Sequence, residues 1–237
     1  MIKKKKILAI VPARANSKGI KNKNIIKLKN KPLIYWPIKA LKNSKYVDEV
    51  IVSTDSEKIK KIAKKFGAKV PFIRPKKLAT NTAKSFDVVK HAINFNLKKG
   101  KKFDYVLLAE PTSPLTTSID IDKAIELLEK KSLTADSITS VAETVNANPF
   151  FSVKLSRYQL LKPYLKKFHD ERRQDIPKVF YFTGNFYISK VKSLLEYKSF
   201  YQKKTLGVVS EKWKALEIDD IYDLISAEAI MKLKNFK

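Results

Sequence analysis

One stretch near the start of the chain, ILAIVPARANSKGIKNKN, combines a short apolar run with a cluster of cations. The apolar run reads as a buried strand that ends at Pro12, followed by a loop. That loop carries Arg14, Ser17, Lys18 and Lys23 around Gly19. A guanidinium grips phosphate oxygens with a planar fork, and lysines act as flexible point charges. The loop is therefore suited to binding a polyphosphate.

Lysine alone is weak evidence here, because the chain holds 50 lysine and arginine residues and only five of them are arginine. Lys21, in the same loop, is expected to be solvated surface. Arg14 carries more weight, since a scarce residue follows a predicted strand, where open α/β sheets bind their ligands.

An acidic segment lies far away in the sequence, at Glu217-Ile218-Asp219. If this segment is extended, alternation places both carboxylates on the same side. Mg²⁺ typically uses one or two carboxylates and completes its shell with water and substrate phosphates. The competing interpretation is that Asp219 and Asp220 cap the final helix.

Apolar periodicity and turn residues predict the elements that position these groups. Strands are expected near residues 7–12, 50–53, 103–109, 136–142, 179–188 and 206–210, and helices near 33–41, 57–66, 85–99, 118–131 and 221–230. Pro32 is expected in the first turn of the first helix. Alternating strands and helices predict an α/β fold with a doubly wound, mostly parallel, Rossmann-like sheet. One domain covers residues 1–237.

The alternation of strands and helices breaks down over residues 143–179, which include NPFF and the charged run FHDERRQDIP. An irregular stretch of this length predicts a small inserted lobe within the domain.

Composition limits the possible functions. A net charge of +27 raises nucleic-acid binding as an alternative. Against it, the excess is lysine spread over the chain, whereas nucleic-acid interfaces favour arginine and stacking aromatics. No cysteine is present, and no apolar run is long enough to span a bilayer. We expect a cytoplasmic protein that binds neither a specific nucleic acid nor a membrane.

The motif VPARANSKGIKNKN resembles the N-terminal signature of the cytidylyltransferases that make CMP-sialic acids and related CMP-nonulosonates. The matching residues are Ala13, Arg14, Ser17, Lys18, Gly19, Lys23 and Asn24. The resemblance implies a fold of the nucleotide-diphospho-sugar transferase type. Arg14, Lys18, Lys23 and Asp219 then become catalytic candidates, with Ala13, Ser17 and Asn24 at the nucleotide.

Later segments extend the resemblance over nearly the whole chain. RPKKLATNTAKS is similar to the family's R-P-x-x-L-A-x-(D/N)-T-x-x-S, which implies that Arg74, Thr82 and Ser85 contact the nucleotide. Ser85 also fits a helix N-cap. EPTSPL is similar to (Q/E)-P-T-S-P-L at the junction of nucleotide and sugar sites. The substrate-binding candidates there are Glu110, Thr112 and Ser113.

RRQDIP and TGN complete the resemblance. Arg173 and Gln174 are the candidates for holding the sugar's carboxylate, and Asn185 for facing the sugar. An Arg beside several acids is also a common surface ion-pair cluster. Three positions depart from the family pattern: Glu110 is often Gln, Thr116 is commonly Arg, and Glu217 is usually Asp.

The implied reaction joins CTP to a nonulosonic sugar acid, giving a CMP-sugar and pyrophosphate. The resemblance also implies Mg²⁺ held by Asp219 and Glu217, and a homodimer in which residues 143–179 reach the neighbouring subunit. The eight-carbon acid Kdo is an alternative acceptor. A catalytically inactive relative with a structural role is a further alternative. The sequence identifies no general base.

Overall fold

A computed structural model describes residues 5–17, 19–144, 147–167, 170–172 and 174–236. Its main sheet has six strands in the order β10-β6-β9-β5-β1-β4. The strands are β1 (Ile7–Pro12), β2 (Lys27–Leu28), β3 (Lys31–Pro32), β4 (Glu49–Ser53), β5 (Tyr105–Leu108), β6 (Ser137–Thr144), β7 (Val153–Leu155), β8 (Leu161–Pro163), β9 (Val179–Lys190) and β10 (Thr205–Val209). The α-helices are α1 (Tyr35–Lys42), α2 (Glu57–Lys65), α3 (Ser85–Lys98), α4 (Ser118–Lys130), α5 (Val191–Tyr197) and α6 (Ile221–Leu233).

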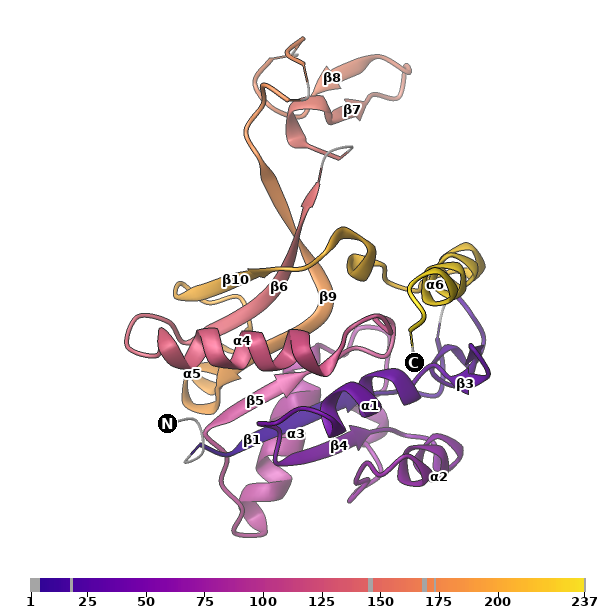
Figure 1. Cartoon of the computed structure of the whole chain (residues 1–237), viewed down its shortest axis with the longest axis vertical. Helices are drawn as coiled ribbons and strands as arrows, with labels where there is room; N and C mark the ends of the chain where they lie inside the picture. The colour runs from indigo at the N-terminus through magenta and orange to yellow at the C-terminus, as the bar shows by residue number, and fades with distance from the viewer. Residues whose placement is uncertain (1–4, 18, 145–146, 168–169, 173, 237) are drawn as a thin grey trace.

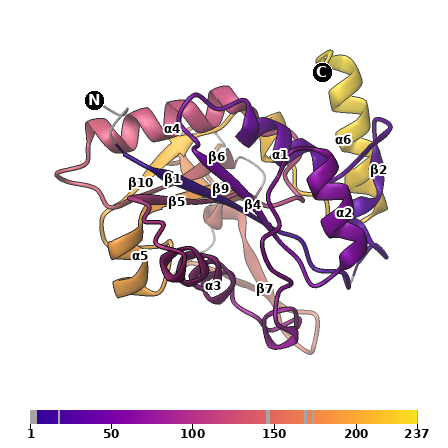
Figure 2. The same cartoon turned by 90° about the horizontal axis from the view of Figure 1, so that it is seen from below.

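The sheet is mostly parallel, as the sequence predicts. Strands β4, β1 and β5 run parallel, and β10 runs parallel to β6. Only β9 is reversed, because it pairs antiparallel with both β5 and β6. Helices cover both faces, with α1 and α4 on one side of the sheet and α3 and α5 on the other (Figure 2).

Strand β1 shows why the sequence folds this way. Its first five residues, ILAIV, are almost wholly buried, as expected for a central strand covered on both faces. Ile7, Ala9 and Val11 pack in the cluster that includes residues of α1 and α4. Leu8 and Ile10 pack in the opposite cluster with α3 and α5. The strand therefore fixes where the loop after Pro12 begins.

Helix starts are set by polar caps. Ser56 accepts a hydrogen bond from the backbone N–H of Ile59 at the start of α2. Thr117 with Asp120 and Asp220 with Asp223 form reciprocal capping boxes at α4 and α6. In the described part of the chain, none of the helices is long and apolar enough to cross a membrane.

The first helix begins later than expected, at Tyr35, so Pro32 is not in its first turn. Pro32 instead pairs with Lys27 in the hairpin of β2 and β3. The two residues between these strands, Lys29 and Asn30, have φ values of 47° and 60°. A two-residue hairpin loop with positive φ at both positions matches the twist of the strands. This local turn separates Pro32 from the helix.

Strands β6 and β9 continue beyond the body of the protein as a two-stranded arm (Figure 1). Their outer pairs run from Val141 with Phe182 to Thr144 with Val179, after a register shift between Thr139 and Val141. The arm carries a small lobe that contains the hairpin of β7 and β8. The described parts of the irregular stretch 143–179 therefore project from the sheet instead of packing on it.

Candidate active site

The loop after β1 is held by hydrogen bonds to three other segments. The Asn24 side-chain amide donates to the Arg14 carbonyl, with an Nδ2–O distance of 2.8 Å. The Ala15 N–H donates to the Asp55 carboxylate over 2.8 Å. Arg14 Nη1 donates to the Thr80 carbonyl over 2.8 Å. Because a guanidinium has five N–H donors, this last bond orients Arg14 while leaving capacity for a ligand.

The segment before α6 lies directly against this loop. Lys23 Nζ is 2.8 Å from Asp219 Oδ1 and 3.0 Å from the Ile218 carbonyl. Gly19 packs so closely on the Asp219 backbone that a Cβ at this position would overlap the Asp219 carbonyl. The Ile218 N–H donates to the Thr112 carbonyl over 2.8 Å. Segments that follow β1 and β5 and precede α6 thus meet at one edge of the sheet.

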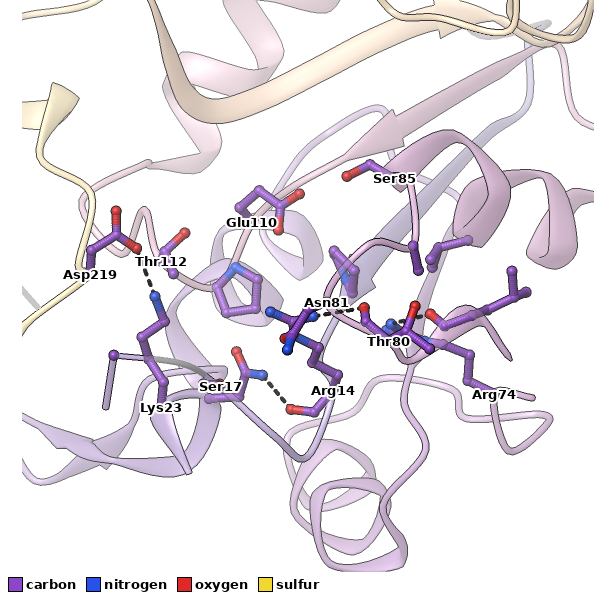
Figure 3. Close-up of a pocket in the computed structure, with 17 residues that line it drawn as sticks. Arg14, Ser17, Lys23, Arg74, Thr80, Asn81, Ser85, Glu110, Thr112 and Asp219 are labelled. Atoms are coloured by element: carbon purple, nitrogen blue, oxygen red, sulfur yellow. Dashed lines mark hydrogen bonds and ion pairs between the residues drawn. The ribbon is translucent and has the colours of Figure 1, made fainter. Parts of the chain in front are cut away.

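A cavity of about 510 Å³ opens between these segments. It is lined by Pro12, Arg14, Ser17, Gly19, Lys23, Asn24, Arg74, Leu78, Thr80, Asn81, Ala83, Ser85, Val88, Glu110, Pro111, Thr112 and Asp219. Figure 3 shows Arg14 and Lys23 on one side, Ser85 on the opposite side and Glu110 between them. This volume lies within the range of small-molecule sites in proteins. These polar groups come from the loops after β1 and β5, the segment between β4 and α3, the start of α3 and the segment before α6.

Glu110 has the most perturbed carboxyl group at the cavity. Burial and, less strongly, the nearby charge of Glu217 raise the pKa of Glu110 to about 7, although Arg74, Lys23 and Arg14 oppose the rise. Burial disfavours the charged form of an acid, and a second carboxylate adds to that effect. Near neutral pH this carboxyl group is therefore partly protonated. It can both donate and accept hydrogen bonds.

Glu217 and Asp219 form a pair of carboxylates beside the cavity. Only Asp219 lines the cavity, and Glu217 accepts a hydrogen bond from the Gly184 N–H. Burial raises the pKa of Glu217, the Gly184 N–H lowers it, and the charge of Asp219 raises it. The mutual repulsion of two carboxylates would be relieved by a bound cation, so the pair fits Mg²⁺.

No cluster of three or more His, Cys, Asp or Glu side chains at metal-binding distance occurs among the described residues. Magnesium does not require such a cluster, because it usually retains waters and binds substrate phosphates. The lack of such a cluster among the described residues therefore does not argue against a magnesium site.

Arg74 makes its hydrogen bonds within the protein, and its expected contact with the nucleotide stays a prediction. It lines the cavity, but its guanidinium donates to the hydroxyl and the carbonyl of Ser53 and to the carbonyl of Leu78. Burial lowers the pKa of Arg74 to about 10. The side chain therefore ties the end of β4 to the loop that follows it. The sequence motif located Arg74 at the site, but its donors are mostly used within the protein.

Several other candidates lie outside the lining of the cavity. Ser113 and Asn185 are 1% exposed, and Ala13 is part of the core. Thr82 is exposed, but its neighbours in the chain line the cavity in its place. Ser113 follows the lining residue Thr112, and Asn185 follows Gly184, whose N–H donates to Glu217.

Ser85 lines the cavity, but it is not the N-cap of α3. Lys84 occupies that position, and Ser85 is the first helical residue. Its hydroxyl is therefore placed at the helix N-terminus, where anions and hydrogen-bond acceptors are favoured.

Two of the candidates, Lys18 and Arg173, lie outside the described residues. Gln174 is exposed and does not line the cavity. The binding of the sugar's carboxylate by Arg173 and Gln174 stays a prediction.

A second hollow of about 280 Å³ shares Ser85 and Glu110 with the first. Its other lining residues are Lys84, Phe86, Leu108, Tyr187, Lys198, Ser199, Phe200 and Tyr201. The hydroxyls of Tyr187 and Tyr201 are 3.4 Å apart. Sequence reasoning did not assign these tyrosines: Tyr187 lies in β9, two residues after the T-G-N motif, and Tyr201 follows the short helix α5, which carries no distinctive motif. The sequence analysis also did not assign Thr80 to the site, because Thr80 contributes a backbone carbonyl that accepts a hydrogen bond from Arg14.

Comparison with known proteins identifies the family. Residues 8–235 match the family model described as Cytidylyltransferase. The chain is 35% identical over 236 residues to the CMP-N,N'-diacetyllegionaminic acid synthase of Legionella pneumophila, covering 96% of this chain and 97% of that protein. It is 32% identical over 232 residues to the N-acylneuraminate cytidylyltransferase of Escherichia coli, covering 97% of this chain. The chain spans only 53% of that longer protein.

A solved structure supports the same fold. The CMP:2-keto-3-deoxy-manno-octonic acid synthetase complexed with CTP superposes with a TM-score of 0.70 at 15% identity, covering 97% of this chain and 99% of that one. At this identity the likeness concerns the fold alone. Because the family model matches nearly the whole sequence, the chain belongs to the cytidylyltransferase family.

Proposed function

We propose that the protein transfers CMP from CTP to a nonulosonic sugar acid and releases pyrophosphate. The observation that carries the proposal is the meeting of the Arg14 loop and Asp219 at one polar cavity. This cavity lies at the carboxyl ends of parallel strands β1 and β5, where α/β sheets bind ligands. The similarity to a legionaminate-activating synthase supports the choice of acceptor.

The triphosphate is assigned to the side of the cavity formed by the loop after β1. Arg14 and Lys23 supply positive charge there, and Lys18 of the same loop is proposed to add to it. The base and ribose are assigned to the segment between Leu78 and Ser85, which lines the other side. Arg74 supports this segment through its bonds to Ser53 and Leu78.

Asp219 and Glu217 are proposed to hold Mg²⁺ next to the triphosphate. When bound, the ion would neutralise phosphate charge and help the pyrophosphate to leave. Lys23 forms an ion pair with Asp219 in the absence of substrate. This lysine is therefore positioned to exchange its contact with the carboxylate for a contact with the phosphates. The chain itself contributes the orientation of both groups.

The reaction is an in-line displacement at the α-phosphorus of CTP. The oxygen of the sugar's anomeric hydroxyl forms the new bond to phosphorus, while the bond to pyrophosphate breaks. Such phosphoryl chemistry is accelerated mainly by positioning and charge stabilisation. Glu110 and Asp219 are carboxylates that line the cavity, and either can accept the proton of the hydroxyl.

The acceptor is assigned to the second hollow, beyond Glu110. This hollow adjoins the nucleotide cavity through Ser85 and Glu110, so an acceptor there lies beside the nucleotide. Arg173 and Gln174 are proposed to hold its carboxylate. Since the arm carries the lobe away from the body of its own chain (Figure 1), we propose that this contact is made to a second copy.

We further propose a homodimer formed through the arm. Phe180, Phe182 and Tyr201 are all exposed along one hollow of about 530 Å³ beside the arm, together with Val209. Large aromatic side chains left in solvent on one face mark a protein interface. CTP is a cytoplasmic metabolite, so the proposal also places the protein in the cytoplasm.

Purified protein supplied with CTP and Mg²⁺ tests the function directly. We expect pyrophosphate release with at least one of N-acetylneuraminate, legionaminate and pseudaminate, and slower release with Kdo. Mass spectrometry of the product should show the matching CMP-sugar. Pyrophosphate release with none of the nine-carbon acids would contradict the proposed acceptor, and release with Kdo alone would establish the alternative.

A further inference from the structure

One carboxyl group is common to the two hollows that the proposed function assigns to the nucleotide and the acceptor. Among the described residues, Glu110 and Ser85 are the two that line both the cavity of about 510 Å³ and the smaller hollow of about 280 Å³. Figure 3 shows Glu110 between Ser85 and the cations of the loop after β1. Substrates that occupy the two hollows and react with each other therefore react beside Glu110.

The backbone around Glu110 is held on both sides. The Ala109 N–H donates to the Ile10 carbonyl over 3.1 Å, so the chain after β5 stays attached to β1. The Ser113 N–H donates to the Glu110 carbonyl over 3.2 Å, and the next residue, Pro111, has a restricted φ. These contacts fix the point from which the Glu110 side chain enters the cavity.

The Glu110 carboxylate itself is not committed to a contact within the chain. Among the residues that the structure describes, no hydrogen bond or ion pair is formed to its oxygens. Burial and the charge of Glu217 oppose its ionisation, and three cations favour it, namely Arg74, Lys23 and Arg14. A buried polar group without a partner is costly unless a ligand satisfies it. The carboxylate is therefore available to accept a hydrogen bond from a substrate.

The other two carboxylates of the site are less available. Glu217 accepts a hydrogen bond from the Gly184 N–H and lines neither hollow. Asp219 lines the nucleotide cavity alone, pairs with Lys23 over 2.8 Å and is assigned to Mg²⁺. An adjacent positive charge favours the ionised form of a carboxylate and so makes it a weaker base.

The remaining polar groups of the acceptor hollow are poor proton acceptors. Burial and the hydrogen bond from the Tyr201 hydroxyl raise the pKa of Tyr187, so this phenol keeps its proton. The charged amino groups of Lys84 and Lys198 are donors and have no acceptor site. In the described part of the chain, no histidine lines either hollow.

We propose that Glu110 is the catalytic base that accepts the proton of the anomeric hydroxyl. This inference rests on the proposed function and selects one of the two carboxylates named there. The O–H bond breaks as the proton passes to a carboxylate oxygen of Glu110, and the hydroxyl oxygen forms its bond to the α-phosphorus. The bond from the α-phosphorus to pyrophosphate breaks, and its electron pair leaves with pyrophosphate. Glu110 then returns the proton to solvent.

Glu110→Gln tests this role, because Gln keeps the shape of the side chain and cannot take up the proton. The assay is run at pH 8, where a carboxyl group of pKa about 7 is mostly ionised. The kcat for pyrophosphate release should fall about 100-fold. The family pattern often has Gln at this position, which makes the test demanding. A fall of less than about tenfold would overturn the proposal.

Chemical rescue separates a base from a residue that only supports the site. Glu110→Ala leaves space for a small carboxylate, so formate should raise the kcat of this variant at least about tenfold, with saturation. Sodium chloride at the same ionic strength should not. Glu110→Gln is the matched control, because its amide fills the space and formate should have no effect. A folded Glu110→Ala chain that formate does not rescue would overturn the role as a base.

Binding of CTP separates the proposed role from a role in holding the nucleotide. Calorimetry should give the same CTP dissociation constant for wild type and Glu110→Gln, within about twofold. Weakened CTP binding with an unchanged kcat would overturn the assignment of Glu110 as the base.

Two results separate this inference from the function on which it rests. Wild-type activity that Glu110→Gln retains overturns the role of Glu110 and leaves the cytidylyl transfer standing. A wild-type chain that releases no pyrophosphate with any nine-carbon acid or with Kdo overturns both.

Discussion

The candidate active site and the lobe differ in how far their side chains are held by contacts within the chain. Around the cavity, polar groups are fixed by the protein itself: Asp55 holds the loop after β1, and Asn24 holds Arg14. In the lobe, the β7–β8 hairpin exposes Tyr158, Leu160 and Tyr164 to solvent. One region is organised before any ligand arrives. The other has surface that only a further contact can bury.

This difference separates the region that is fixed by its own contacts from the region that leaves apolar surface exposed. A preorganised site spends little free energy on ordering when a substrate binds. An exposed apolar lobe gains its stabilisation from association, because the hydrophobic effect follows the area removed from water. Substitutions should therefore act on activity and folding at the site, and on assembly at the lobe.

The largest effect is expected from removing the charges at the cavity. Arg14→Ala and Asp219→Ala should each lower kcat/KM about 100- to 1000-fold, because each removes a charge that stabilises the transition state. Steady-state pyrophosphate release measures this. Lys21→Ala, an exposed lysine of the same loop, is the matched control and should retain activity. Full activity in either site variant would refute the role given to that residue.

The next largest effect is expected at Glu110, in the way the free energy of unfolding depends on pH. Its pKa is raised from 4.5 to about 7, so the folded protein keeps a proton that the unfolded chain loses. The carboxyl group of Glu110 therefore makes its full contribution to the free energy of unfolding below about pH 4.5. This contribution is lost as the pH rises to about 7. Glu110→Gln should be more stable than wild type by about 3 kcal/mol at pH 8 and equally stable near pH 4.

Denaturant unfolding of wild type and Glu110→Gln at both pH values measures this difference. The same difference at pH 4 and pH 8 would mean that Glu110 keeps an ordinary pKa.

Gly184 offers a smaller effect within the site. A Cβ there would lie 2.5 Å from Glu217 Oε1, so Gly184→Ala must displace that carboxylate. We expect a loss of about 1 to 3 kcal/mol in the free energy of unfolding. Gly207→Ala, where the nearest atom to a Cβ is a Val141 methyl at 3.3 Å, should cost less. Equal losses would argue that Glu217 has room to move.

The smallest effect on folding is expected in the lobe. Tyr158→Ser should change the free energy of unfolding of the monomer by less than about 0.5 kcal/mol, because the side chain is exposed. Phe186→Ser, in the core, should cost at least about 3 kcal/mol. Dilute samples keep the chain monomeric for this measurement. A large loss in Tyr158→Ser would mean that the lobe supports the body, contrary to the comparison.

Much of the fold follows from local sequence patterns. The buried run ILAIV and the alternation of strands and helices predicted a mostly parallel α/β sheet, which the structure and its similarity to solved nucleotidyltransferases confirm. The reversed direction of β9 was not predicted, because strand direction depends on how the chain returns and not on side-chain periodicity. The misplaced start of α1 has a similar cause, a turn at Lys29 and Asn30.

Site residues that act through the side chain of a motif residue were predictable from the sequence. Contacts made by backbone groups were less predictable. Residue types indicated a cationic loop at Arg14 and Lys23 and an acidic segment at Asp219, the resemblance placed them in one site, and the structure joins Lys23 to Asp219. The hydrogen bonds from Arg74 to backbone carbonyls were not predicted, because every residue has a carbonyl group and the sequence does not show which ones accept a hydrogen bond. For the same reason the Thr80 carbonyl was missed.

The bond between Lys23 and Asp219 joins residues 196 positions apart. One wall of the cavity is therefore translated early and the opposite wall late. A chain still emerging from the ribosome would have its strand β1 loop long before the acidic segment that closes it. Nascent protein would thus be unable to trap the nucleotide until synthesis had passed Asp219, and any premature stop before that residue would yield an open, inactive product.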